Sequence, residues 1–145
     1  VRAVNPSVEV EVHRRFFSRG EGGLFRGADL VVDALDNIPS RLALQEHCAA
    51  LGIPMVHGAI AGYTGQVMTV YPGDPGLSAL YPTGIERGVE RETGNPPFTP
   101  ALVASLQVAE VVKVLCGTGQ PTRGGFLLVD LYENRFDFVP LEQPE

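Results

Sequence analysis

A short apolar run followed by an amphipathic segment is the clearest pattern in the sequence. Residues 30–32 read Leu-Val-Val, which is typical of a strand that is buried on both faces of a parallel sheet. Residues 38–51 then carry Leu44, Cys48 and Leu51 at the spacing of one helix face. A strand that leads directly into such a helix predicts half of a βαβ unit.

The next segments complete this unit and then reverse its direction. Residues 54–60 read as a second strand, and the order strand, helix, strand predicts a right-handed parallel crossover. Residues 66–71 follow after a link too short for a crossover, which predicts an antiparallel partner. Residues 124–130 and 135–139 flank a turn and predict a terminal β-hairpin. The predicted fold class is α/β, with a mixed sheet of parallel strands followed by antiparallel strands.

Two further segments are periodic. Val8, Val10 and Val12 alternate with polar residues, which predicts a half-exposed strand near an edge of the sheet. Residues 99–116 predict the longest helix, with Thr99 as its cap. The apolar stripe of this helix consists of Leu102, Leu106, Ala109, Val112 and Cys116.

Residues 72–97 show no sustained periodicity and are rich in Gly and Pro. A structureless stretch of that length inside a compact domain is usually functional or mobile. We therefore expect a long mobile crossover loop at residues 72–97. Because the chain begins with Val1 and not Met, we also expect residues 1–145 to be a single partial domain of a longer protein.

The composition restricts the partners. The 145 residues are 44% hydrophobic and 19% charged, which is ordinary for a folded soluble domain. A net charge of −6 argues against nucleic acid as a partner. No apolar run reaches the length of about 20 residues that a membrane span needs, and no signal peptide opens the chain, so we expect a cytoplasmic protein without membrane contact. Cys48 and Cys116 both fall in apolar helical patterns and are expected to be buried.

Acidic residues collect at the end of the first predicted strand, where open α/β sheets bind their ligands. Asp36 has two interpretations, as a carboxylate that holds Mg²⁺ against nucleotide phosphates or as a residue that helps to cap the next helix. Asn37 is the predicted N-cap of that helix. Asp33 is expected to be a structural carboxylate.

Two basic side chains near this strand end are also candidates. Arg41 could bridge to Asp33, Asp36 or a phosphate, or could form a local ion pair. His57 interrupts the second strand near its carboxyl end, and its default interpretation is a core histidine with satisfied hydrogen bonds, with a place in the site as the alternative. The sequence has no Gly-x-Gly-x-x-Gly after a first strand and no P-loop, so the expected phosphate cradle is missing from it.

Four segments resemble one known family, in register over nearly the whole chain. They are Asp29-Leu-Val-Val-Asp-Ala-Leu-Asp-Asn, Cys48-Ala-Ala-Leu-Gly-Ile-Pro, Val56-His-Gly-Ala-Ile-Ala-Gly-Tyr-Thr-Gly-Gln-Val67 and Ala104-Ser-Leu-Gln-Val-Ala-Glu-Val-Val-Lys113. Together they resemble the ThiF/MoeB/HesA family, the bacterial relatives of ubiquitin-activating enzymes. The resemblance implies that the chain is the C-terminal half of a Rossmann-like domain.

The resemblance also implies a reaction. Family members use Mg-ATP to adenylate the C-terminal glycine of a ubiquitin-like sulfur-carrier protein, usually as homodimers, in thiamine, molybdopterin or related biosynthesis. Asp36 matches the family aspartate at the Mg-ATP site, which implies the catalytic and metal-binding role. Asn37 and Arg41 match the family's Asp-Asn-x-x-x-Arg pattern, which implies a neighbouring place in the cofactor-binding site.

Three departures from the family pattern limit this expectation. The family's nucleotide-binding half precedes Val1, so we expect the chain alone to be inactive. Residues 77–82 read Leu-Ser-Ala-Leu-Tyr-Pro where many members have a zinc-binding Cys-x-x-Cys, so no structural zinc is expected. Residues 88–94 contain no cysteine that could accept the activated carrier.

Two rival functions remain open at this point. One is a non-catalytic dimerisation or carrier-docking module of the same fold. The other is a nicotinamide-dependent oxidoreductase, because half of a Rossmann sheet is alike in both classes. In either case the apolar run at residues 30–32 and the stripe on residues 99–116 are expected to leave apolar surface exposed, and we expect the chain to associate as a dimer or larger.

Overall fold

The computed structural model describes residues 1–17, 19–81 and 94–141. Its elements, in chain order, are η1 (Arg19–Phe25), β1 (Val31–Asp33), α1 (Ile38–Leu51), β2 (Met55–Ala61), β3 (Thr64–Val70), α2 (Gly76–Leu80), α4 (Phe98–Cys116), β4 (Gly125–Asp130) and β5 (Arg135–Pro140). The two long helices and the five strands lie within two residues of the segments that the sequence predicts.

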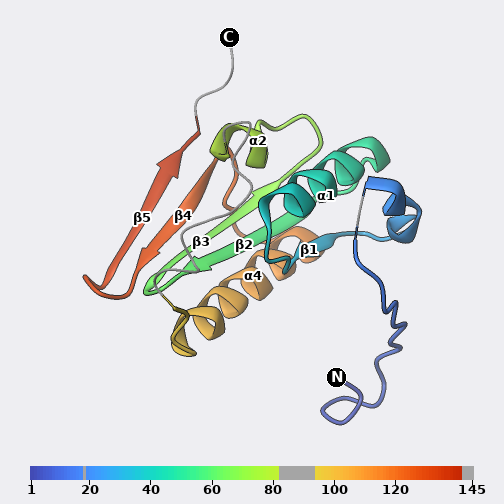
Figure 1. Ribbon diagram of the computed structural model, residues 1–145, viewed down its shortest axis with the longest axis horizontal. Helices are drawn as coiled ribbons and strands as arrows, with labels where there is room; N and C mark the ends of the chain where they lie inside the picture. The colour runs from blue at the N-terminus through green and yellow to red at the C-terminus, as the bar shows by residue number, and fades with distance from the viewer. Residues whose placement is uncertain (18, 82–93, 142–145) are drawn as a thin grey trace.

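The strands form one sheet in the order β1-β2-β3-β4-β5, so strands that follow one another in sequence are neighbours in space (Figure 1). β1 and β2 are parallel, and the remaining neighbours are antiparallel. This confirms the predicted mixed sheet with a terminal β-hairpin. Because β1 and β2 run the same way, Asp33 at the carboxyl end of β1 stands opposite His57. His57 is the third residue of β2, which continues to Ala61, so the expectation that it lies near the carboxyl end of its strand is wrong.

Local sequence signals explain both ends of α1. The side chain of Asn37 accepts a hydrogen bond of 2.9 Å from the backbone N–H of Ser40, as the predicted N-cap should. Pro39 lies in the first turn, where its missing N–H has no helical partner to lose. Gly52 follows the helix in the left-handed conformation and ends it.

The two faces of the sheet have different covers. α1 and α2 cover one face, and α4 runs along the other (Figure 1). The α1 face holds the apolar core. Its buried members are Val31, Leu44, Cys48, Ile53, Met55, Met68, Val70, Leu77 and Phe126.

α4 lies directly against the backbone of β2 and β3. A Cβ atom at Gly58 would collide with the amide group of Gln107, and one at Gly65 would collide with Val103. Glycine at these two strand positions is therefore what allows the helix to approach so closely.

The predicted cap of α4 was wrong. Pro97 and not Thr99 precedes the first helical residue. Thr99 is buried inside the helix, and its hydroxyl donates a 2.8 Å hydrogen bond to the carbonyl of Gly62. The threonine thus ties α4 to the β2–β3 turn, a tertiary contact that overrides its capping preference.

Two other predictions were wrong. Residues 8–12 form no strand, and residues 1–17 extend away from the sheet (Figure 1). An alternating segment without a neighbouring strand gains no ladder of hydrogen bonds, and nothing in the described chain pairs with it. Cys116 is exposed, since the buried residues of α4 end at Glu110, whereas Cys48 is buried as predicted.

The expected loop at residues 72–97 is only partly described. It begins with the short helix α2, which packs against α1 and buries Leu77. The backbone N–H of Leu77 donates to the side chain of Gln45 at 2.5 Å, which fastens this part of the segment to the core. Residues 82–93, on which the mobility prediction mainly falls, lie outside the described residues.

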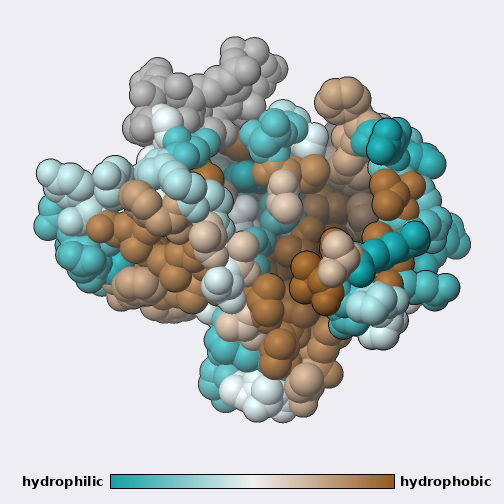
Figure 2. Space-filling view, turned by 90° about the horizontal axis from the view of Figure 1, so that it is seen from below, coloured by the Kyte–Doolittle hydropathy of each residue, from teal (hydrophilic) through white to brown (hydrophobic). Residues whose placement is uncertain are grey.

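The outward face of α4 is apolar and exposed. Val108, Val112 and Leu115 are 62%, 48% and 56% exposed. Seen from below, on the side where α4 lies, hydrophobic side chains gather across the middle of the molecule (Figure 2). By length and composition alone, the 19 residues of α4 would suit a membrane span, but the inward face carries Gln107 and Glu110.

Candidate functional site

Asp36 stands on the turn between β1 and α1, at the carboxyl end of the parallel strand pair. Its side chain is exposed, and Oδ1 accepts a hydrogen bond of 3.2 Å from Nδ2 of Asn37. Among the described residues, Asn37 is the single side chain that hydrogen-bonds this carboxylate. Asp36 therefore keeps a carboxylate oxygen available to a ligand at the sheet edge where α/β folds bind substrates.

The residue before it is held from both sides. The backbone N–H of Leu35 donates to Oδ1 of Asp33 at 2.9 Å. The backbone carbonyl of Leu35 accepts two hydrogen bonds from the guanidinium of Arg41, from Nε at 2.9 Å and from Nη2 at 2.6 Å. Asp33 and Arg41 are both buried, and Arg41 Nε lies 3.9 Å from Asp33 Oδ2.

His57 connects Asp33 to the next strand. Its Nδ1–H donates to Oδ2 of Asp33 at 2.6 Å, and both side chains are fully buried. Burial lowers the pKa of the imidazole below its ordinary value of 6.5, and the hydrogen bond to Asp33 only partly opposes this shift. The ring is therefore neutral, and Nε2 carries a lone pair that accepts a 3.1 Å hydrogen bond from Nε2 of Gln66.

The same amide group of Gln66 reaches a second residue. Gln66 Nε2 donates to the hydroxyl of Tyr81 at 2.6 Å, and Nη1 of Arg41 lies 3.4 Å from that hydroxyl. Burial raises the pKa of the Tyr81 phenol, which keeps it protonated. These hydrogen bonds form a closed ring. From Asp33 it passes through His57, Gln66, Tyr81, Arg41 and the Leu35 carbonyl, and the N–H of Leu35 closes it at Asp33.

The predicted site residues divide into two groups. Asp36 and Asn37 reach the surface of the strand end, although Oδ1 of Asn37 also caps α1. Arg41 and His57 do not reach it. The Arg41 guanidinium donates two hydrogen bonds to the Leu35 carbonyl, and His57 is enclosed between Asp33 and Gln66. His57 is therefore the core histidine of its default interpretation.

Sequence reasoning missed three members of this region. Gln66 and Tyr81 complete the ring, and Gln107 donates a 2.8 Å hydrogen bond from α4 to the backbone carbonyl of Asp33. Gln66 did carry a signal, because it is a polar residue at the same period-two face as Met68 and Val70. Tyr81 and Gln107 come from distant segments and carried none.

A single exposed carboxylate suits Mg²⁺ when a nucleotide supplies the other ligands. Mg²⁺ favours one or two protein carboxylates together with phosphate oxygens and water. The described part of the chain contains no group of three or more His, Cys, Asp and Glu side chains that could hold a metal ion by itself. Asp36 therefore fits a metal that arrives with phosphates, with Asn37 beside it.

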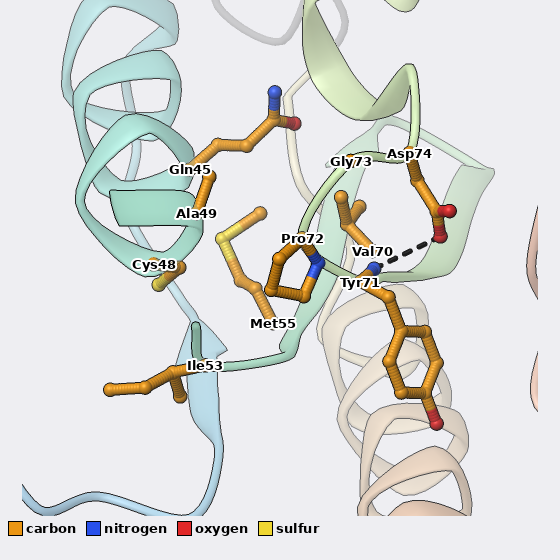
Figure 3. Close-up of a pocket in the computed structure, with 10 residues that line it drawn as sticks. All are labelled: Gln45, Cys48, Ala49, Ile53, Met55, Val70, Tyr71, Pro72, Gly73 and Asp74. Carbon is orange, nitrogen blue, oxygen red and sulfur yellow. Dashed lines mark hydrogen bonds between the residues drawn. The ribbon is translucent and has the colours of Figure 1, made fainter. Parts of the chain in front are cut away.

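Two hollows in the structure lie elsewhere. A cavity of about 20 Å³ between α1 and the turn after β3 is lined by Cys48, Met55 and Tyr71 among others (Figure 3). It has room for about one water molecule. Burial raises the pKa of the Cys48 thiol to about 11, so this cavity holds no thiolate. A shallower groove of about 470 Å³ lies between Arg26–Asp29 and Leu51–Pro54, at the amino ends of the strands and opposite Asp36.

Comparison with known proteins identifies relatives of the whole chain. The model of the ThiF family matches residues 1–145. The chain is 37% identical over 144 residues to the SAMP-activating enzyme E1 of Haloferax volcanii, covering 97% of this chain and 53% of that protein. It is 38% identical over 146 residues to the sulfur carrier protein adenylyltransferase of Thermus thermophilus, covering 94% of this chain and 54% of that protein.

Solved structures share the fold at lower identity. Escherichia coli MccB with ATP superimposes with a TM-score of 0.77 at 13% identity, over 99% of this chain and 46% of that one. PaaA superimposes with a TM-score of 0.70 at 15% identity, over 97% of this chain and 52% of that one. The chain thus spans about half the length of the relatives it matches. With the family model matching from end to end, the chain belongs to the ThiF family.

Proposed function

We propose that the protein containing this chain is an adenylyltransferase that activates the C-terminal glycine of a ubiquitin-like sulfur-carrier protein with Mg-ATP. The observation that carries the proposal is the placement of Asp36, an exposed carboxylate at the carboxyl end of the parallel strands. The relatives support it, because two of them are named as a sulfur carrier protein adenylyltransferase and a SAMP-activating enzyme.

The reaction transfers an adenylyl group to a carboxylate. An oxygen of the carrier's terminal carboxylate forms a bond to the α-phosphorus of ATP, and the bond from that phosphorus to the β-phosphate bridging oxygen breaks. The products are the acyl-adenylate and pyrophosphate. Negative charge builds up on the phosphate oxygens during this step, so positioning and electrostatic stabilisation supply most of the catalysis.

Asp36 contributes one metal ligand to this chemistry. A bound Mg²⁺ would neutralise charge on the phosphates of ATP. Asn37 donates to Oδ1 of Asp36, which directs the carboxylate and leaves its second oxygen to face the metal. The positive end of α1 begins at Asn37 and favours anions at the same place.

The proposal extends to the partners. We propose a homodimer as the working form, with the carrier protein as the macromolecular substrate. The part of the protein that this chain does not span would hold the remaining ATP contacts, since the relatives are about twice as long. The rival function, a non-catalytic docking module, needs no carboxylate at Asp36 and is separated from adenylation by the experiment below.

The test is carrier-dependent exchange of labelled pyrophosphate into ATP, measured on the full-length protein. We expect Asp36→Asn to lower the exchange rate by about 100-fold or more, because a neutral amide cannot balance the charge of the metal and phosphates. Asp29→Asn is the matched control, since Asp29 is also exposed and lies just before the other end of β1. Exchange by Asp36→Asn at the wild-type rate would exclude this role for Asp36, and a wild-type protein without exchange would favour the docking module.

A further inference from the structure

The proposed reaction uses Asp36 and Asn37 but none of the residues that form the hydrogen-bonded ring beside them. Its members bring charged groups into the interior, where a carboxylate and a guanidinium are costly unless their hydrogen bonds are satisfied. Asp33 is fully buried and Arg41 is 9% exposed. Leu35, the residue on which both of them converge, immediately precedes Asp36.

We propose that Arg41 and the Asp33–His57 pair are positioning residues, which clamp the two peptide groups that flank Leu35 and so hold Asp36 in one orientation for adenylation. This inference rests on the proposed function of Asp36. It assigns Arg41 a task that differs from phosphate binding, because the guanidinium is already turned inward onto the Leu35 carbonyl.

The geometry of the clamp is specific. Asp33 accepts from the N–H on one side of Leu35, and Arg41 donates twice to the carbonyl on the other side. A planar fork with two donors onto one oxygen restrains both the position and the tilt of that peptide group. The turn before α1 would otherwise be free to rotate about the Leu35 and Asp36 backbone torsions.

The two arms of the clamp are also braced against each other. His57 holds the carboxylate of Asp33 through Nδ1–H, and Gln66 links His57 to the Tyr81 hydroxyl that contacts Arg41. Neutral His57 is required, because a proton on Nε2 would face the donor N–H of Gln66. Among the described residues, the charged and titratable groups that face His57 are Asp33, Arg41 and Tyr81.

The first readout tests the clamp without any activity measurement. Amide hydrogen exchange of Leu35 in the full-length protein should be slow, because its N–H is bonded to the buried Asp33 carboxylate. We expect faster exchange at Leu35 in His57→Leu and in Arg41→Lys. In His57→Asn the side-chain amide stands where Nδ1 stood and can still donate to Asp33, so protection should return.

The second readout asks whether the clamp serves catalysis. We expect Arg41→Lys and His57→Leu to lower kcat of pyrophosphate exchange by about 10-fold or more, with KM for ATP within about 2-fold of wild type, as is usual for residues that orient a metal ligand. His57→Asn should recover most of kcat. Thr69→Val, on the opposite face of the sheet, is the control for loss of stability alone, because it removes the hydrogen bond to Glu110 without touching the ring.

The outcomes separate the two proposals. If His57→Leu does not fold, Arg41→Lys and His57→Asn still decide the question. Unchanged exchange at Leu35 in both variants would overturn the clamp, and faster exchange with an unchanged kcat would overturn its role in catalysis, each leaving the proposed function intact. A raised KM for ATP in Arg41→Lys with an unchanged Leu35 amide would show Arg41 to be a phosphate ligand. A wild-type protein that catalyses no pyrophosphate exchange would overturn the proposed function, and the clamp's catalytic role with it.

Discussion

The helix on one face of the sheet buries mainly apolar side chains, whereas the helix on the other face buries mainly polar ones. α1 places Ile38, Leu44 and Cys48 against the core. The buried residues of α4 are Thr99, Val103, Gln107 and Glu110, and its apolar residues Val108, Val112 and Leu115 point outward. The α1 face is held by a large apolar cluster, whereas on the α4 face hydrogen bonds from buried polar side chains accompany a smaller set of buried valines, among them Val67, Val103 and Val129.

The polar contacts of α4 are well satisfied. The Glu110 carboxylate accepts from the Thr69 hydroxyl at 2.7 Å, from the Thr122 backbone N–H at 2.7 Å and from Lys113 Nζ at 2.6 Å. Gln107 reaches across to the Asp33 carbonyl at 2.8 Å. Together with the buried Val103, these bonds hold α4 on the sheet, while Val108, Val112 and Leu115 face away from it. We infer that the outward face of α4 is built to be covered by other protein.

The largest difference between the faces should appear in core truncation. Met55→Ala removes a side chain that is wholly buried on the α1 face and should lower the free energy of unfolding by about 3 kcal/mol. Val112→Ala, on the outward face of α4, should change it by less than about 0.5 kcal/mol. Urea denaturation followed by circular dichroism measures both. A loss at Val112 equal to that at Met55 would mean that α4 is buried in solution.

The next largest loss of stability should come from neutralising a buried carboxylate on the α4 face. Glu110→Gln puts an amide where several donors converge and should lower the free energy of unfolding by about 2 kcal/mol. Glu133→Gln, at an exposed position, is the control and should have little effect.

The same variant should alter the dependence of stability on pH. Burial raises the pKa of the Glu110 carboxyl, but hydrogen bonds from Lys113, Thr122 and Thr69 outweigh it, and the net pKa lies below the ordinary 4.5. The native state therefore binds this proton less readily than the unfolded chain does. The contribution to stability is complete above about pH 4.5 and is lost as the pH falls through the lowered native value. Glu110→Gln should flatten this part of the difference curve, and an unchanged slope would contradict the assignment.

The α1 face could be predicted in more detail than the α4 face. Hydrophobic periodicity located β1, α1 and β2, and the residue type at the helix start predicted the cap at Asn37. Both signals are local in the sequence. The apolar stripe Leu102, Leu106, Ala109, Val112 and Cys116 found α4 but not its inward face, because Gln107 and Glu110 look like solvent-facing residues until their distant partners are known. Hydrophobic periodicity cannot identify a helix face that is chosen by hydrogen bonds.

The candidate site divides in the same way. Asp33, Asp36 and His57 could be placed near one another from the parallel order of two strands. The inward turn of Arg41 could not, because it depends on a carbonyl six residues earlier and on Tyr81, forty residues later. Residues 82–93, which follow Tyr81, lie outside the part of the chain that the structure describes.

The outward face of α4 should mediate association between chains. Three apolar side chains at i, i+4 and i+7 stand roughly half or more exposed, which is the pattern of a helix that packs against a partner helix. We expect the isolated chain to form dimers or larger species at micromolar concentration. Val112→Glu places a charge in the middle of this stripe and should weaken association by about 10-fold or more, while changing the stability of the folded chain by less than about 0.5 kcal/mol.

Sedimentation velocity across a range of concentrations measures this directly. Ser105→Glu is the matched control, because Ser105 is also exposed on α4 but lies outside the apolar stripe. A clean monomer for the wild-type chain at micromolar concentration would refute self-association through α4. Equal weakening by both variants would mean that net charge, and not the apolar stripe, controls association. A loss confined to Val112→Glu would show that the face left free by the polar packing of α4 is the face through which the chain pairs.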